Sequence, residues 1–331
     1  MKRKDLLTIL DKIKSGTSNN RDEVTSNFLF TGKEISSYDD QIAIQHPLKT
    51  DFSLFVNANN LYKIVTKLKT EQINLSKKNE KLNIKNKTSN LNLSIIQDTE
   101  LTNKMNSIEQ SMKNKKWKAL PTNFINNILL CYPLASKQES DQTLTYVFIE
   151  NQDCIASDNS RIAFTMMDES MPNMFIKASK VPYLIKINPV KYAIGKSWIH
   201  FKNTDNCIFS MRKIEGVYPD FLQFKEFDGT KIKLSKKILE GVDLSLIVAD
   251  VLDPLIIVKI ANNICYIVTE SELGKVQYKS KIEYSGKEIS FTINPEFLKE
   301  MMSHSSSIII SKERAKLKTD TDFALVTSLY A

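Results

Sequence analysis

Short apolar runs separated by polar turn residues recur along the chain. In the middle of the sequence, residues 146–149, 154–156 and 162–164 form three such runs, and groups of Asn, Asp and Ser separate them. Runs of this kind predict antiparallel strands joined by tight turns. Similar stretches occupy residues 27–44 and 256–278, so the pattern appears three times.

An isoleucine aligns the three stretches. Ile35, Ile155 and Ile267 each precede a small or β-branched residue and then a Ser or Thr, at intervals of 120 and 112 residues. Self-similarity at a nearly constant interval is typical of tandem copies of one structural unit. The sequence therefore predicts three copies of a unit of about 110 residues, which is a usual length for a domain.

Apolar residues at helical spacing predict two helices in each copy. Asn57 and Asn294 are suited to cap two of these helices, because an Asn side chain accepts a hydrogen bond from the first turn. The second helices of the three copies open with similar sequences at Phe55, Phe175 and Phe291. The expected helices cover residues 2–14, 58–68, 122–130, 178–187, a segment that Ser235 caps, and 296–302.

The helices alternate with strands, so the fold class is α+β with domains at 1–112, 113–225 and 226–331. Strands are expected at 73–76, 81–85 and 91–96 in the first copy, at 198–201 and 207–211 in the second, and at 307–311 and 323–329 in the third. Residues 97–118 are polar. We interpret them as the connection between the first two domains, with a strand possible at its end.

Composition narrows the class of protein. A chain of 331 residues with 42% hydrophobic and 25% charged residues is typical of a soluble globular protein. No apolar run approaches the roughly 18 residues that a membrane span needs. Four cysteines lie far apart and form no paired motif, so we expect reduced, buried thiols in a cytoplasmic protein. They are Cys131, Cys154, Cys207 and Cys265.

No segment carries a motif for catalysis. Nucleophile elbows, phosphate-binding loops and zinc-protease motifs are missing from the sequence, and only 8 glycines are present. Its three histidines have no neighbouring ligand residues. Asp158 and Arg161 could suggest an acid–base pair, but a salt bridge within a turn is commoner. We therefore expect no enzyme activity, no cofactor and no metal.

Two of the predicted helices are basic and lack acidic residues. A net charge of +8 agrees with a polyanionic partner. Lys63 and Lys67 are four residues apart and so share one helix face. The alternative is an ordinary solvated face. Acid-free helices at equivalent places in two copies favour binding to a nucleic-acid backbone without reading its sequence. The basic residues are Lys63, Lys67 and Lys69 in the first copy and Lys177, Lys180 and Lys186 in the second.

Three segments resemble one family. IASDNSRIA at 155–163 is similar to the TDGxRLA segment of the bacterial replicative sliding clamp, the β subunit of DNA polymerase III. RKIEGVYPDF at 212–221 is similar to the segment that crosses from its second to its third domain, and FTINPEFL at 291–298 to a helix start in its third domain. Asn159 stands where the family has Gly, and Asn tolerates positive φ better than most residues. Such departures are typical of a divergent or a phage- or plasmid-encoded member.

The resemblance implies three domains of the DNA-clamp (processivity) fold, each with two helices packed on antiparallel sheets. Two chains would close head to tail into a ring around double-stranded DNA, in a sequence-independent way, with helices lining the hole. The ring would tether DNA polymerase and would also bind the clamp loader and other replication and repair proteins that carry a clamp-binding peptide. The resemblance thus implies a processivity factor in DNA replication that catalyses no reaction. It also implies a cytoplasmic protein that does not bind membranes.

The resemblance also assigns residues to three sites. For DNA they are Arg3, Lys12, Lys63, Lys67, Lys177 and Lys180. For the pocket of the partner peptide they are Leu144, Ser157, Asn159, Ser160, Arg161, Ile162, Leu325 and Thr327. For the dimer interface they are Leu91, Leu93, Ile247 and Val248. The alternative for Ile162, Leu325 and the four interface residues is that they fill the domain cores.

A second function would suit the same fold. The chain could be a monomeric clamp-like decoy or regulator that binds clamp partners without encircling DNA. The mass of the native protein separates the two hypotheses, because a clamp is expected to be a dimer and a decoy a monomer.

Overall fold

The structure is a computed structural model that describes residues 1–18, 24–96, 99–226, 228–320 and 322–330. Helices pack on antiparallel sheets, which confirms the predicted α+β class. The chain divides into two compact units, Met1–Ile125 with Lys180–Glu215 and Asn126–Ser179 with Gly216–Ala331. Among the described helices, none is both long and apolar enough to cross a bilayer.

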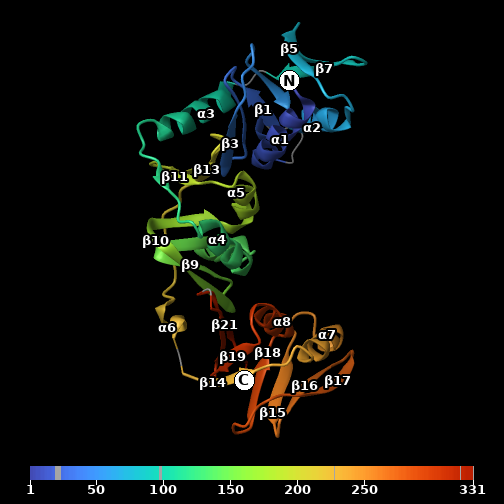
Figure 1. The fold of residues 1–331 in the computed structure, drawn as a ribbon, viewed down its shortest axis with the longest axis vertical. Coiled ribbons are helices and arrows are strands. Elements are labelled where there is room, and N and C mark those ends of the chain that lie inside the picture. Colours follow the sequence, from blue (N-terminus) through green and yellow to red (C-terminus); the bar gives the residue numbers. More distant parts are fainter. Residues whose placement is uncertain (19–23, 97–98, 227, 321, 331) are drawn as a thin grey trace. The chain divides into compact units, whose positions relative to one another are not determined.

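The first unit contains one sheet of 11 strands, in the order β5-β6-β7-β4-β1-β2-β3-β13-β12-β11-β8. Figure 1 labels several of these strands and the helices α1, α2, α3 and α5 of this unit. Its helices are α1 (Arg3–Ile13), α2 (Ala58–Lys67), α3 (Thr99–Met112) and α5 (Val181–Ile187). Its strands are β1 (Asn27–Phe30), β2 (Glu34–Tyr38), β3 (Ile42–Pro47), β4 (Leu54–Asn57), β5 (Asn74–Lys78), β6 (Lys81–Lys85), β7 (Asn90–Ile96), β8 (Lys118–Ala119), β11 (Lys191–Ile194), β12 (Trp198–Lys202) and β13 (Ile208–Arg212).

Helices α1 and α2 pack side by side on β1–β4. Side chains at helical spacing, such as Leu6 and Leu10 of α1, are buried there. Alternate strand residues, such as Ile42 and Ile44 of β3, are also fully buried, because successive side chains of a strand point to opposite faces. As predicted, the side chain of Asn57 caps α2, where it accepts a hydrogen bond from the backbone N–H of Asn60.

The sheet of the first unit runs from the first repeat into the second. Strand β3 pairs antiparallel with β13, and Ala43 lies opposite Ser210. This shared sheet explains why the second half of the second repeat packs with the first repeat. The predicted boundaries at 112 and 225 follow the repeat in the sequence, whereas the compact units follow the shared sheets, so these boundaries stay a prediction.

The second unit contains two sheets. Six strands have the order β14-β19-β20-β21-β10-β9, and four have the order β17-β16-β15-β18. The helices are α4 (Phe124–Cys131), whose first two residues belong to the first unit, α6 (Leu222–Lys225), α7 (Ile238–Val248) and α8 (Pro295–His304). The strands are β9 (Tyr146–Ser157), β10 (Arg161–Lys177), β14 (Thr230–Lys233), β15 (Ile256–Ala261), β16 (Ile264–Ser271), β17 (Gly274–Lys281), β18 (Ile289–Ile293), β19 (Ser307–Ile310), β20 (Arg314–Lys318) and β21 (Ala324–Ser328).

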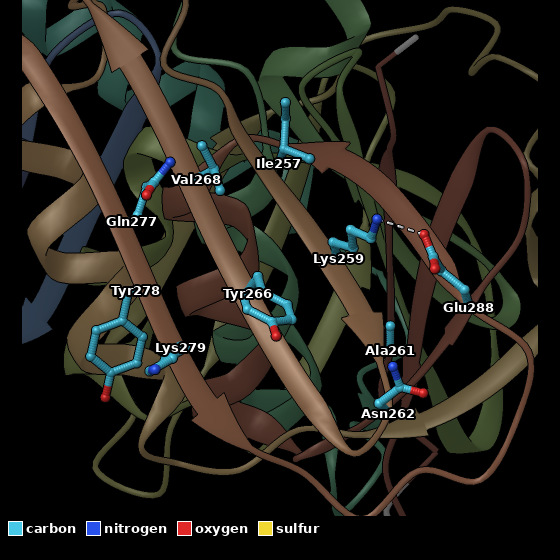
Figure 2. Close-up of a pocket in the computed structure, with 10 residues that line it drawn as sticks. All are labelled: Ile257, Lys259, Ala261, Asn262, Tyr266, Val268, Gln277, Tyr278, Lys279 and Glu288. Carbon is cyan, nitrogen blue, oxygen red and sulfur yellow. Dashed lines mark ion pairs between the residues drawn. The ribbon is translucent and has the colours of Figure 1, made fainter.

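Strand pairing again joins two repeats in the second unit. Strand β10 of the second repeat pairs antiparallel with β21 of the third, and Ile162 lies opposite Val326. The four-stranded sheet is covered on one face, where α7 packs on β16 and β17 and against α8. Its opposite face carries Ile257, Tyr266 and Lys279, which are exposed (Figure 2).

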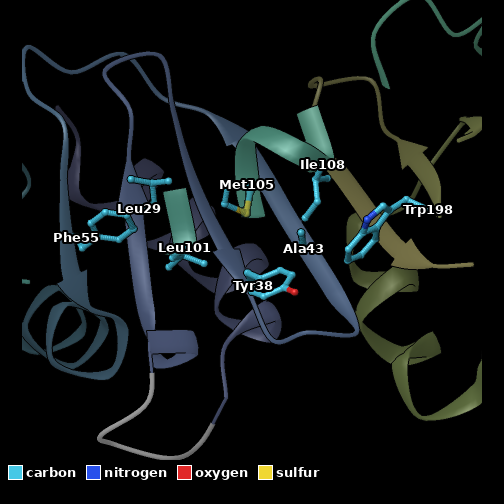
Figure 3. Close-up of a cluster of buried hydrophobic side chains, with 8 residues drawn as sticks. All are labelled: Leu29, Tyr38, Ala43, Phe55, Leu101, Met105, Ile108 and Trp198. Carbon is cyan, nitrogen blue, oxygen red and sulfur yellow. The ribbon is translucent and has the colours of Figure 1, made fainter. Parts of the chain in front are cut away.

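Helix α3 is the main element that the sequence did not predict. Residues 97–118 were expected to be a polar connection, but Thr99–Met112 form a helix of 14 residues. Its apolar side chains Leu101, Met105 and Ile108 are buried against the face of the sheet that α1 and α2 leave free (Figure 3). The strand expected at the end of this connection is present as β8. Residues 97 and 98 lie outside the described part of the chain.

The strand registers correct one alignment. Leu29 pairs with Phe55, and Ile257, at the equivalent position of the third repeat, pairs with Thr292. Phe55 therefore corresponds to Thr292, not to Phe291. The corrected register aligns Asn57 with Asn294, the two residues whose side chains cap helices.

Candidate functional site

The turn between β9 and β10 is held by its own polar side chains. The Asp158 carboxylate accepts hydrogen bonds from the backbone N–H groups of Ser160 and Arg161 at 3.1 and 2.8 Å. Its second oxygen lies 2.6 Å from Nη2 of Arg161, which confirms the predicted salt bridge within the turn. Asn159 has φ of +73°, the left-handed conformation expected at the position where the related segment has Gly.

Arg161 also connects this turn to α8 of the third repeat. Its Nη1 donates to the Glu300 carboxylate, and its guanidinium lies 4.4 Å from the centre of the Phe297 ring. Two carboxylates and one aromatic ring therefore fix the orientation of Arg161. The side chain is a rigid part of the surface beside β21.

A small cavity of about 50 Å³ lies between this turn and β21. Six of the eight residues assigned to the peptide pocket line it, and the structure therefore brings them together: Ser157, Asn159, Ser160, Arg161, Ile162 and Thr327. Leu144 and Leu325 do not line it. Leu325 is fully buried opposite Ala163 of β10, where it fills the core.

Four further residues line this cavity and were not predicted: Phe224, Arg314, Val326 and Ser328. Val326 and Ser328 are the neighbours of Thr327 on β21. Assigning pocket residues one position further along this strand than Leu325 and Thr327 would have selected both of them. The guanidinium of Arg314 lies 4.4 Å from the centre of the Phe224 ring. Arg314 lies on β20, which was not predicted as a strand, so no sequence pattern placed it at this cavity.

The basic residues of α2 are exposed, as predicted. Lys63 and Lys67 lie four residues apart on α2, and no ion pair to either is found within the described ranges. Beside them, a second cavity of about 340 Å³ at the start of α1 is lined by Lys2, Arg3, Lys4 and Lys69 together with Thr70, Glu71 and Gln72. The N-terminus of a helix favours anions, so the four cations reinforce a positive field.

The other three residues assigned to DNA are engaged within the chain. The Nζ atom of Lys12 lies 3.2 Å from Asp205, and that of Lys180 lies 2.6 Å from Asp39. Lys177 is only 6% exposed, and its Nζ lies 2.7 Å from Glu139.

The expectation that Lys177 belongs to the basic face of a helix is wrong. It is the last residue of β10, and the helical segment begins after it at Ala178. Strand pairing with Tyr146 holds its backbone. Its ammonium donates to Thr145 at 2.9 Å, so the side chain is turned into the protein.

The residues assigned to the dimer interface fall into two groups. Ile247 is 72% exposed near the end of α7, and Val248 next to it is half-buried. Leu91 and Leu93 are half-buried on β7, where they lie opposite Ile84 and Leu82 of β6. Their role at an interface stays a prediction.

Burial holds the side chains of Cys207, Cys265 and His200 in their uncharged forms. The four cysteines are buried and free, as predicted. Burial raises the pKa of the Cys207 and Cys265 thiols to about 12, so they remain protonated. Burial lowers the pKa of His200 to about 4, and its ring lies between the hydroxyls of Ser111 and Ser210 at 2.9 and 2.8 Å. No group of three or more His, Cys, Asp or Glu residues that could hold a metal occurs among the described residues.

No protein-family model and no curated protein matches this sequence. Solved structures match it over the whole chain. The DNA polymerase sliding clamp from Bacillus subtilis is 17% identical with a TM-score of 0.82, and the match covers 100% of this chain and 98% of that one. The DNA polymerase III subunit beta from Pseudomonas aeruginosa is 16% identical with a TM-score of 0.82, covering 100% and 99%.

A third solved structure agrees. The sliding clamp from Pseudomonas aeruginosa bound to griselimycin is 17% identical with a TM-score of 0.85, and the match covers 100% of this chain and 98% of that one. The resemblance of the three short segments is thus confirmed at the level of the fold. The chain has the fold of the bacterial DNA polymerase sliding clamp.

Proposed function

We propose that this chain is a sliding clamp. Two copies close head to tail around duplex DNA and tether a DNA polymerase and other proteins of replication and repair. The clamp performs no reaction and needs no cofactor. The observation that carries the proposal is the way in which strands join one repeat to the next.

Each joint uses the same two strands of the repeat. The strand at the position of β3 in one repeat pairs with the last strand of the next, as β3 itself pairs with β13 and as Arg161–Phe164 of β10 pair with β21. In the third repeat β17 has the position of β3, because it pairs with β16 as β3 pairs with β2, so by this rule it pairs with the last strand of another repeat. Strand β17 is an edge of its sheet. Within the described part of the chain, Asn90–Ser94 of β7 pair on one side only, with β6.

An open strand edge invites pairing with another chain. Antiparallel pairing of β17 with β7 of a second copy repeats the observed joint, and a symmetric pair of such joints closes a dimer. Two copies then supply six repeats to one ring. This arrangement is the head-to-tail homodimer that the proposed clamp requires.

Exposed apolar side chains at the end of α7 support the same interface. Ile247 and Leu244 on α7 and Leu273 in the turn before β17 are all exposed. The hydroxyl of Ser271 donates to the Val248 carbonyl and ties this turn to α7. Because contiguous exposed apolar groups mark interaction sites, we place Ile247 and Val248 against Leu91 and Leu93 of the second copy.

The basic residues near α1 and α2 supply the proposed contacts with DNA. Lys63, Lys67 and Arg3 are the main ones, and Lys2, Lys4 and Lys69 extend the positive surface around Arg3. Contacts of this kind bind phosphates without reading bases, so the protein can slide. Lys12 and Lys180 would first have to leave Asp205 and Asp39, and buried Lys177 would have to leave Glu139.

The cavity beside the turn of 157–162 is the proposed site for a peptide carried by the polymerase, the loader and other partners. Its apolar side chains Ile162 and Val326 suit a short apolar peptide, and Arg314 is the cation that could meet an acidic group of that peptide, because Arg161 is already paired with Asp158 and Glu300. The alternative, a monomeric decoy that binds partner peptides, uses this same cavity and lacks the closed ring.

Retention on circular DNA tests the proposal. The chain is loaded by its cognate clamp loader onto nicked circular DNA, and its retention is measured before and after the circle is cut. A clamp is retained on the circle and lost from the linear form, and its native mass is that of a dimer. A protein of monomer mass that is never retained on the circle would contradict the clamp and favour the decoy.

A further inference from the structure

The four-stranded sheet of the third repeat has one face that no described segment of the chain covers. We call it the open face. It lines a cavity of about 780 Å³, and its larger apolar side chains are those of Ile257, Tyr266 and Val268 (Figure 2). Ile257 is 47% exposed, although it lies on β15 in the interior of the sheet.

The same face of the first repeat is covered. The strand registers make Leu29 the equivalent of Ile257. Leu29 pairs with Ser36 on one side and with Phe55 on the other. Ile257 pairs in the same way with Val268 and with Thr292. Leu29 is only 5% exposed. It belongs to the buried cluster in which Leu101, Met105 and Ile108 of α3 rest on the sheet (Figure 3). These three residues lie at positions i, i+4 and i+7, which form one apolar stripe along a helix.

In the second repeat, another connecting segment covers this face. Phe148 pairs with Phe175 as Leu29 pairs with Phe55, so Phe148 is the equivalent of Leu29. The Tyr218 ring stacks on Phe148 with 5.1 Å between centroids. Two of the three repeats thus bury this face under an apolar segment that lies outside the sheet. The third repeat has the equivalent strands, but no described segment of the chain covers its open face.

The open face also differs in charge. Lys275 and Lys279 replace Ala43 and Pro47 of the first repeat, by the registers of β17 and β3. Lys275 is paired with Glu270 at 2.6 Å, and Lys259 with Glu288 at 2.7 Å. Across the described residues, no ion pair to Lys279 is found. The face therefore carries a surplus of positive charge around its apolar centre.

We propose that the open face docks an amphipathic helix of a partner protein, with apolar residues at i, i+4 and i+7 and acidic residues beside them. The helix lies across β15, β16 and β17 as α3 lies on the first repeat. Its apolar stripe covers Ile257, Tyr266 and Val268, and its carboxylates pair with Lys279. This surface is separate from the cavity lined by Ser157 and Thr327.

Two synthetic peptides with the sequence of residues 99–112 serve as probes. The acidic probe carries Lys104→Glu, and the basic probe carries Glu100→Lys and Glu109→Lys, so both keep the apolar stripe. Each is labelled and titrated with the full-length protein, and binding is followed by fluorescence anisotropy. The acidic probe is expected to bind saturably, and the basic probe at least about tenfold more weakly because of the charge of the face. Hydrogen exchange is expected to slow within residues 256–281.

Two variants locate the binding. Ile257→Glu removes an apolar anchor and is expected to weaken the acidic probe at least about tenfold. Leu222→Glu changes an exposed leucine outside the four-stranded sheet and serves as the matched control, with affinity within about twofold. Equal binding of the two probes, or unchanged binding to Ile257→Glu, would overturn the proposal. The proposal would also be overturned if the native mass fell in Ile257→Glu but not in Leu222→Glu. That result would mean that a second copy of this chain, not a partner helix, covers the open face.

Discussion

The ring of Tyr218 stacks on the ring of Phe148, with centroids 5.1 Å apart and planes inclined by 11°. Tyr218 belongs to the segment that leads from the second repeat to the third, and Phe148 to the first strand of the second repeat. Phe175 lies beside both rings, at 4.7 Å from Phe148. The connection is therefore part of a hydrophobic core.

Truncating Tyr218 is expected to destabilise the protein. Tyr218→Ala leaves a cavity above Phe148 and Phe175, and large aromatic deletions in a core cost about 3–5 kcal/mol. Urea unfolding measures the change, and Tyr218→Phe, which keeps the ring, is the control. A loss below about 1 kcal/mol for Tyr218→Ala would show that the connection is not part of the core.

Reversing two charges on α2 is expected to weaken DNA binding. Lys63→Glu with Lys67→Glu removes two phosphate contacts, and each contact contributes about 0.9 to the slope of log affinity against log salt. The slope is thus expected to fall by about 2, measured by anisotropy with a labelled duplex.

The control for this measurement is Lys279→Glu, which changes a lysine on the sheet face away from α7 and α8. Its slope is expected to match that of the unaltered protein. An unchanged slope in the α2 double variant would place DNA on another surface.

Two lysines at the end of α7 are expected to open the proposed ring. Ile247→Lys with Val248→Lys introduces charge at a surface that is apolar and exposed in the single chain, so the variant should fold as a monomer. Light scattering at micromolar concentration gives the mass. Leu222→Lys adds charge at another exposed leucine and should remain a dimer. A dimeric α7 variant would rule out this interface.

Ile162 and Leu325 are expected to respond differently to alanine. Ile162→Ala acts on the wall of the peptide cavity and should lower the affinity for a clamp-binding peptide of the cognate polymerase by about 1–2 kcal/mol. Leu325→Ala acts in the core and should cost about 2–5 kcal/mol of stability. Calorimetry and thermal unfolding measure the two effects. Peptide binding unaffected by Ile162→Ala would exclude this cavity as the docking site.

Stability is expected to depend on His200 below neutral pH. Its pKa is about 4 in the folded protein and about 6.5 when unfolded, so between these values the unfolded chain binds a proton that the folded chain does not. The stability of the fold is fully retained above pH 6.5 and decreases as the pH falls towards 4. Each pKa unit corresponds to 1.36 kcal/mol, so the total loss is about 3 kcal/mol.

Urea unfolding at pH 7 and pH 5 measures this effect. The decrease in stability between the two values should be smaller in His200→Asn than in the unaltered protein. His304→Gln, at an exposed histidine, should behave as the unaltered protein does. An equal decrease in His200→Asn would assign the pH dependence to other groups.

Periodicity predicted the elements that have strong apolar patterns or clear caps. Asn57 and Asn294 marked the starts of α2 and α8, and the run before Lys85 marked β6. Helix α3 was missed because Leu101, Met105 and Ile108 are separated by Thr, Asn, Lys and Ser, which are equally common in loops. Only the apolar face of the sheet beneath them makes this segment a helix.

The part of the candidate site that one short segment of the chain forms could be predicted from the sequence. The turn from Ser157 to Ile162 closes on itself, so its residues meet in the cavity as expected. Lys177 could not be judged from spacing, because its ion pair with Glu139 and its burial depend on a segment 38 residues away. Arg314 reaches the cavity through the pairing of β20 with β21, which no short sequence pattern specifies.

The pairing of β3 with β13 determines where this chain can be divided for study. A fragment that ends at residue 112 would keep α3 but would lose Trp198 beneath it, together with the strand opposite Ile42–Gln45. Such a fragment would expose a new sheet edge and would be prone to aggregate. A fragment of residues 1–215 retains both sides of this joint, although its segment 126–179 would lose the pairing with β21. Removing single repeats is therefore a poor route to a minimal folded piece of this protein.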